Sequence, residues 1–107
     1  MDRVYKRKNY DYQKERIRKI KQIYGPTAAD DYEKFHALQN GLCAVCSLPE
    51  TRPGSRGGVS PLVIDHDHAT GRIRGLLCNA CNQALGQLQE NPDRIQALLS
   101  YVEERCQ

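Results

Sequence analysis

The sequence predicts a small α+β domain in which one β-hairpin lies among helices. The chain has 107 residues, enough for one domain, and 39% of them are hydrophobic, so the buried core is modest. Only residues 62–77 have the strand, turn and strand pattern of a hairpin, whereas helical spacing prevails before and after them. Four of the five cysteines form two pairs, one before and one after this hairpin, which suggests an additional cross-link that stabilises the fold.

Two helices are predicted before the first cysteine pair. The first covers residues 4–24, which contain few helix-breaking residues, and the sequence YGPT ends it. Thr27 followed by Asp30 resembles a capping box that opens a second helix over about residues 28–39, and the dipeptide NG stops that helix. The inner faces of the two helices are formed by Ile17, Ile20, Tyr24, Tyr32, Phe35 and either Leu38 or Gln39.

The hairpin and two more helices are predicted after an irregular loop over residues 47–61, which are rich in Pro, Gly and Ser. LVI opens the first strand, ATG forms the turn and RIRGLL is the return strand. A helix after the second cysteine pair should carry Ala84, Leu85 and Leu88. Asn91 is the expected N-cap of the last helix, over about residues 92–105. The apolar stripe of that helix is formed by Ile95, Leu98, Leu99 and Val102.

Positive charge is concentrated at the N-terminus. Residues 1–24 contain nine Lys and Arg residues against three acidic residues, a net charge of +6, whereas the whole chain carries +3. We therefore divide the chain into a basic, helical N-terminal arm, residues 1–24, and a domain, residues 25–107. A basic arm favours a polyanionic partner such as DNA, because Lys and Arg side chains that neutralise phosphates release condensed counterions. A solvated helix or tail would have the same charge pattern.

The sequence indicates a soluble protein of the cytoplasm that has no membrane partner. No apolar run is long enough to span a membrane, and the segment MDRVYKRKNY has no apolar stretch of the kind found in signal peptides. Thiols stay reduced in the cytoplasm, so paired cysteines there are more typical of a metal site than of disulfides.

The two CxxC pairs predict a structural zinc site. Each pair can place two thiolates on one tetrahedral cation, and two pairs complete a closed site that leaves no position for water. The ligands would be Cys43, Cys46, Cys78 and Cys81, with Cys106 left over. Because the hairpin lies between the pairs, zinc would hold both of its ends and contribute folding free energy.

A second set of donors lies on the hairpin and just after it. The sequence DHDH interrupts the apolar strand pattern with Asp65, His66 and His68, and Asn82 directly follows the last cysteine of the second pair. A carboxylate together with an amide oxygen suits a Mg²⁺-like ion, which keeps several waters and accepts phosphate oxygens. A neutral histidine beside the ion can take a proton from water. These are the parts needed to hydrolyse a phosphodiester.

The order of these motifs resembles the recombination endonuclease VII family of phage junction-resolving nucleases, which belong to the His-Me finger (HNH, ββα-metal) nucleases. GLCAVC and LVIDHDHATGRIRGLLCNACN carry the resemblance, which covers roughly residues 25–105. It implies a zinc-stapled ββα-metal core of hairpin plus helix with flanking helices. The activity it implies is that of a divalent-metal-dependent DNA endonuclease in the host cytoplasm, with duplex or branched (junction) DNA as substrate.

The resemblance also assigns roles to the donor residues. Asp65 and Asn82 would hold the catalytic Mg²⁺ or Mn²⁺ ion, His66 would be the general base, and His68 would contact or orient the phosphate. The structural zinc would be held by Cys43, Cys46, Cys78 and Cys81. Junction cleavage needs two paired active sites, so a homodimer is a further expectation.

The hairpin backbone should bend near these donors. Asp65 and His66 would point to opposite faces of an ideal strand, so both can serve one site only if residues 65–68 are irregular. On the return strand, Arg72 and Arg74 share a face, where they either grip a phosphate or form a solvated surface.

Two other functions remain open at this point. A zinc-stabilised DNA-binding module without catalytic activity would account for the basic arm and the four cysteines, but not for DHDH and Asn82. A zinc-organised adaptor for protein interactions would in addition leave the basic arm unexplained.

Overall fold

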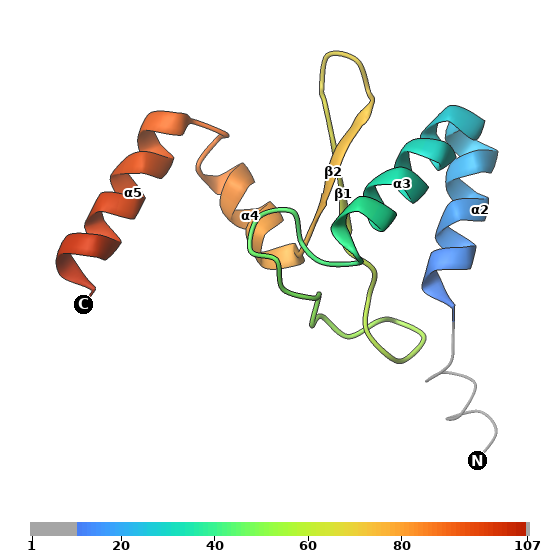
Figure 1. Ribbon diagram of the computed structural model, residues 1–107, viewed down its shortest axis with the longest axis horizontal. Helices are drawn as coiled ribbons and strands as arrows, with labels where there is room; N and C mark the ends of the chain where they lie inside the picture. Colours follow the sequence, from blue (N-terminus) through green and yellow to red (C-terminus); the bar gives the residue numbers. More distant parts are fainter. Residues whose placement is uncertain (1–10, 107) are drawn as a thin grey trace.

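The computed structural model describes residues 11–106, which form four helices and one two-stranded antiparallel sheet (Figure 1). The hairpin lies in the middle, with two helices on its N-terminal side and two on its C-terminal side. The elements are α2 (Tyr12–Tyr24), α3 (Pro26–Gln39), β1 (Val63–His66), β2 (Ile73–Leu77), α4 (Asn79–Gln87) and α5 (Pro92–Arg105). The predicted α+β class is thus confirmed, and none of the described helices is long and apolar enough to cross a membrane.

The start of α2 differs from the prediction. Asp11 is the N-cap, and its carboxylate accepts a hydrogen bond from the N–H of Lys14 at 2.9 Å, so the helix begins at Tyr12. The part of the expected helix over residues 4–10 lies outside the described residues. Gly25 ends α2 with a φ of 93°, a conformation that residues with a side chain rarely adopt.

The predicted capping box of α3 is wrong. Gly25 takes the N-cap position without a side-chain hydrogen bond, and Pro26 takes the first helical position, where its missing N–H leaves nothing unpaired. The helix therefore begins before Thr27. Its end agrees with the prediction, because Asn40 adopts the left-handed conformation that stops a helix.

The core lies between α2, α3 and the hairpin. Tyr32 is 1% exposed and Leu76 is fully buried. Of the two candidates for the inner face of α3, Gln39 is the residue that contacts β2, whereas Leu38 is 68% exposed. The other buried residues are Ile20, Ala29, Cys43, Leu62, Ile73, Leu77 and Cys78. Helix α2 contributes Ile20 to this core and packs against α3.

The two C-terminal helices begin at side-chain caps. Cys78 caps α4, since its sulfur accepts the N–H of Cys81 at 3.4 Å, so α4 begins inside the second cysteine pair and not after it. Asn91 caps α5 with its side-chain oxygen, as predicted. No other described element packs extensively against α5, and its predicted apolar stripe is 39–49% exposed (Figure 1).

Candidate functional site

The four paired cysteines lie together where α3 and β2 end. Their sulfur atoms are all within 4.8 Å of one another, and the Sγ atoms of Cys46 and Cys78 are 3.8 Å apart. In an ideal tetrahedral site with Zn–S bonds of about 2.3 Å, neighbouring sulfurs are roughly 3.8 Å apart. The cluster could therefore hold zinc. Cys106 lies exposed at the end of α5, outside the cluster, as the spacing predicted.

The thiols of this cluster differ in how easily they ionise. Burial opposes ionisation of Cys43, but backbone N–H groups directed at its sulfur outweigh burial and lower its pKa to about 6. Burial and then the neighbouring cysteine sulfurs raise the pKa of Cys81 to about 12. Cys43, which ionises easily, thus belongs to the same cluster as Cys81, which resists ionisation. A bound cation would stabilise the cluster, because metal ligation favours the thiolate form.

Hydrogen bonds hold the CAVC turn, residues 43–46, and the end of α3 against the outer edge of β2. The Nε2 of Gln39 donates to the carbonyl of Leu76 at 2.8 Å, and its Oε1 accepts the N–H of Leu76 at 3.1 Å. The N–H of Ala44, inside the CAVC turn, donates to the same carbonyl at 3.0 Å. The side-chain amide thus takes the place of a neighbouring strand, and these bonds fix the cysteines relative to the hairpin.

The hairpin bends at the predicted place. Asp65 pairs with Gly75, but the next residue, His66, pairs with Ile73, so Arg74 is an extra residue on β2. A bulge of this kind increases the local twist and changes the direction of nearby side chains. As a result, Asp65 and His66 line one cleft although they are consecutive in a strand.

The turn of the hairpin is built on Asp67. Its Oδ1 accepts the N–H groups of Thr70 at 3.1 Å and Ala69 at 2.8 Å, and these bonds lower the pKa of Asp67. Gly71, with a φ of 75°, donates its N–H to the carbonyl of Asp67 at 2.7 Å. Asp67 therefore shapes the turn that carries His68.

All four predicted donors outside the cysteine cluster meet in one cleft of about 250 Å³, which we call the donor cleft. Asp65 and His66 come from β1, His68 from the turn and Asn82 from α4. The remaining lining residues are Ile64, Leu85, Gly86 and Glu90. The two histidines also line a larger cleft of about 580 Å³ that opens toward α2 and α3.

A guanidinium already holds the carboxylate of the donor cleft. Arg74 donates to both oxygens of Asp65, and its Nη2 also donates to Oε1 of Glu90 at 2.7 Å. Hydrogen bonds to these two carboxylates raise the pKa of Arg74. Arg72 is likewise paired, with Asp31 of α3 at 2.7 and 3.0 Å. The two arginines are therefore bound to carboxylates while remaining solvent-exposed, which agrees with the predicted solvated face, and the predicted phosphate grip stays a prediction.

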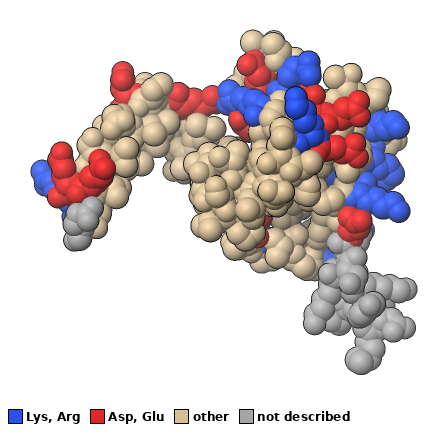
Figure 2. Space-filling model, in the orientation of Figure 1, with Lys and Arg blue, Asp and Glu red and all other residues tan. Residues whose placement is uncertain are grey.

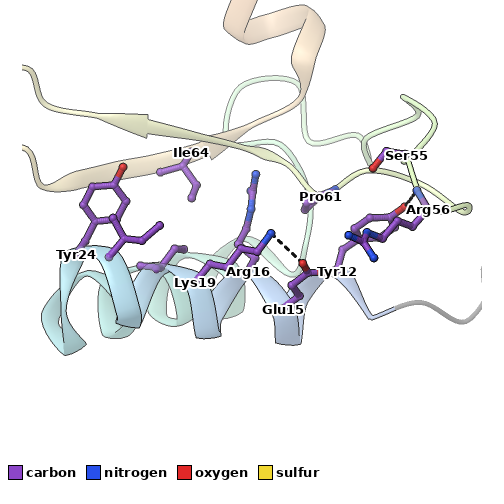
Figure 3. Close-up of a pocket in the computed structure, with 11 residues that line it drawn as sticks. Tyr12, Glu15, Arg16, Lys19, Tyr24, Ser55, Arg56, Pro61 and Ile64 are labelled. Carbon is purple, nitrogen blue, oxygen red and sulfur yellow. Dashed lines mark hydrogen bonds and ion pairs between the residues drawn. The ribbon is translucent and has the colours of Figure 1, made fainter.

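A third cleft, of about 420 Å³, lies between α2 and the loop that precedes β1 (Figure 3). Tyr12 holds that loop, because its hydroxyl donates to the carbonyl of Gly57 at 2.6 Å and accepts the N–H of Arg56 at 2.7 Å. Lys19 pairs with Glu15 one turn away on α2 at 2.9 Å. The residues that this cleft shares with the larger histidine cleft are Ile20, Tyr24 and Ile64.

The family model of recombination endonuclease VII matches residues 14–104. The chain belongs to the recombination endonuclease VII family. The match runs from α2 to α5 and includes both the cysteine cluster and the donor cleft.

Two curated relatives of this endonuclease VII family chain are phage proteins, each called Gene 59 protein. The protein from Mycobacterium phage D29 is 34% identical over 85 residues, which are 78% of this chain and 47% of that protein. The protein from Mycobacterium phage L5 is 38% identical over 85 residues, 78% of this chain and 48% of that protein. The chain thus spans about half the length of these relatives.

Two residues at the site of this endonuclease VII family member were missed by sequence reasoning. Gln39 stood only as an alternative to Leu38 on a helix face, with no signal of its bonds to β2. Glu90 reaches the donor cleft through a turn in which it and Gln89 have positive φ values of 53° and 57°. Its N–H donates to the carbonyl of Leu85 at 3.0 Å, which folds the turn back, and no spacing in the sequence indicates this contact.

Proposed function

We propose that this chain is a divalent-metal-dependent DNA endonuclease of the His-Me finger (HNH, ββα-metal) type. One observation carries the proposal: Asp65, His66, His68 and Asn82 converge on one cleft, although they come from a strand, a turn and a helix. Family membership supports nuclease activity on DNA.

In this proposal the cysteine cluster binds a structural zinc ion. Four thiolates leave no open position for water, so the cluster has no part in the chemistry. Its contribution is positional, because Cys78 and Cys81 belong to the start of α4 and Asn82 is the next residue of that helix. Holding the start of α4 against the hairpin therefore holds Asn82 opposite Asp65.

The donor cleft fits a hard divalent cation. Asp65 offers a carboxylate and Asn82 an amide oxygen, ligand types that Mg²⁺ and Mn²⁺ prefer. The guanidinium of Arg74 lies against Asp65, which supports the view that positive charge is stabilised at this place. When bound, the ion would polarise the scissile phosphate and stabilise charge on the leaving oxygen.

The two histidines supply the remaining functions. His66 is exposed and lies beside Asp65, so its neutral imidazole would accept a proton from the attacking water. His68, whose Nε2 is 3.6 Å from a carboxylate oxygen of Glu90, would contact or orient the phosphate.

The basic face of α2, which we define as Lys14, Arg18, Lys19 and Lys21, would bind the DNA backbone. These side chains are exposed, and blue side chains gather along the α2 edge of the molecule in Figure 2. The clefts beside α2 are adjacent and lead to the two histidines. A phosphate backbone that follows α2 would therefore reach the catalytic hairpin.

Branched DNA and a homodimer belong to the same proposal. The apolar stripe of α5 is 39–49% exposed in the single chain, and a second copy would cover it. Two copies would supply the two active sites that junction cleavage needs. A gel that compares a four-way junction with a matched linear duplex tests the substrate, and sedimentation at several concentrations tests the dimer.

Plasmid nicking tests the activity itself. The purified protein should nick supercoiled plasmid with Mg²⁺ and not with EDTA, and His66→Ala should lower the rate by roughly 10²- to 10⁴-fold, as expected for a general base. His36→Ala is the matched control, since this third histidine lies in the last turn of α3 and lines none of the three clefts. It should keep wild-type activity.

A zinc-stabilised DNA-binding module without catalytic activity is the second candidate. The observation that favours it is the pairing of both Asp65 oxygens with Arg74, which leaves the carboxylate neutralised. Zinc-loaded protein that binds DNA but never nicks it, at any Mg²⁺ or Mn²⁺ concentration, would support the module and refute the endonuclease.

A further inference from the structure

The donor cleft contains a positive charge of its own. Arg74 is the residue that the bulge adds to β2, and its guanidinium bridges the carboxylates of Asp65 and Glu90. The Asp65 side chain is only 17% exposed, and those of Arg74 and Glu90 are 36% and 37% exposed. Partial burial makes these charge interactions stronger than those between fully solvated groups.

Glu90 is brought to this bridge at a cost in backbone energy. It and Gln89 both have positive φ values, which residues with side chains adopt rarely and at some expense. Backbone hydrogen bonds within the turn, such as that from Glu90 to Leu85, contribute to offsetting this cost, and so does the contact of Glu90 with Arg74 at 2.7 Å; Glu90 also lies 3.6 Å from His68. In this turn between α4 and α5, a second carboxylate faces the guanidinium.

We propose that Arg74 is a built-in counter-ion that competes with the divalent cation for Asp65 and Glu90, and that metal binding releases it toward the DNA phosphate. This inference rests on the proposed function, because it takes Asp65 as a metal ligand. A guanidinium and a divalent cation use the same carboxylate oxygens and repel each other, so each weakens the binding of the other at this place.

Release of Arg74 links metal binding to DNA binding. Once freed, the guanidinium remains on the hairpin close to His68 and can donate to phosphate oxygens in place of the carboxylates. A bound phosphate gives Arg74 another partner, so DNA should tighten metal binding, and by linkage metal should tighten DNA binding by the same factor. Without DNA, Arg74 weakens metal binding in the donor cleft.

Mn²⁺ binding to the zinc-loaded, DNA-free protein tests this inference without any measurement of cleavage. The readout is the loss of the free-ion EPR signal at constant ionic strength. Arg74→Gln should tighten Mn²⁺ binding by on the order of tenfold, a size typical of coupling between two sites. Arg72→Gln is the matched control, since Arg72 pairs with Asp31 outside the donor cleft, and its Mn²⁺ affinity should be that of the wild type.

Two double variants identify the carboxylates responsible for the tighter Mn²⁺ binding. Asp65→Asn in the Arg74→Gln background should abolish the increase in Mn²⁺ affinity, and Glu90→Gln in the same background should reduce that increase. Arg74→Lys keeps the charge but lacks the planar fork that bridges two carboxylates, so it should tighten Mn²⁺ binding to an intermediate degree. The lysine variant decides the matter if Arg74→Gln does not fold, as judged by zinc content and circular dichroism.

The failures of the two proposals are distinguishable. If Asp65→Asn weakens Mn²⁺ binding but folded Arg74→Gln binds no more tightly than the wild type, the counter-ion is refuted and the proposed metal site stands. If Asp65→Asn leaves wild-type Mn²⁺ binding unchanged, the metal site at Asp65 fails and the counter-ion fails with it.

Discussion

Replacing Gln39 by alanine should destabilise the protein by about 2 kcal/mol. The N–H of the fully buried Leu76 donates to Oε1 of Gln39 at 3.1 Å. Without that oxygen the N–H has no partner on the outer edge of β2, and leaving a buried donor unpaired costs about 1–3 kcal/mol. The carbonyl of Leu76 keeps its bond from the N–H of Ala44 at 3.0 Å, whereas the carbonyl of the half-buried Leu42 also loses its bond from Nε2 of Gln39, at 2.7 Å.

Urea unfolding at a fixed free zinc concentration measures this loss. The thermal midpoint should fall by about 10 °C, from the usual relation between stability and melting temperature in small domains. Gln22→Ala, on the exposed surface of α2, is the matched control and should change stability by less than about 0.5 kcal/mol. An equally small change for Gln39→Ala would show that water replaces the side chain and that Gln39 does not fasten α3 to the hairpin.

Three further perturbations test other parts of the molecule. Cys78→Ser should abolish stoichiometric zinc and unfold or strongly destabilise the protein, whereas Cys106→Ser should change neither, as elemental analysis and circular dichroism will show. The hydrogen bond from Arg72 lowers the pKa of Asp31 from its ordinary 3.8, so the pair stabilises the fold above about pH 4 and this contribution is lost as the pH falls through the lowered value. In Asp31→Asn the urea unfolding midpoint should therefore fall less steeply as the pH is lowered below about 4. The same steepness as in the wild type would contradict the pairing. Replacing the four residues of the basic face of α2 with glutamines should weaken DNA binding and leave the zinc content unchanged. The slope of log affinity against log salt concentration should decrease in magnitude by up to about 4. An unaltered slope would mean that α2 does not contact phosphates.

The features that the sequence predicted well have local causes. Asn91 before Pro92 starts α5 because an N-cap side chain and a fixed φ act within one turn. The bend at Asp65 and His66 followed from the alternation of a strand, since two consecutive donors can face one cleft only at an irregularity. The cysteine cluster followed from spacing alone, because each CxxC pair brings its own two sulfurs together.

The features that the sequence did not predict depend on contacts between distant segments. Gln39 and Leu76 are 37 positions apart, and Arg72 and Asp31 are 41 positions apart, so no local pattern connects them. The start of α3 differs from the prediction because Pro26, which suits the first helical position, begins the helix before the capping-box pattern at Thr27. Glu90 was missed because its approach to the hairpin depends on an uncommon backbone conformation.

A metal titration of plasmid nicking tests most directly whether the donor cleft is a metal-dependent active site. Asp65→Ala and Asn82→Ala should lose activity at low Mg²⁺ and regain part of it at high Mg²⁺ or Mn²⁺, because each removes a ligand and mass action compensates for weaker binding. His66→Ala should stay roughly 10²- to 10⁴-fold slower at every metal concentration, because it removes the base and no ligand. Losing His68 should have an intermediate effect. Wild-type nicking by His66→Ala, or its full rescue by metal, would contradict a general base at this position and with it catalysis in this cleft.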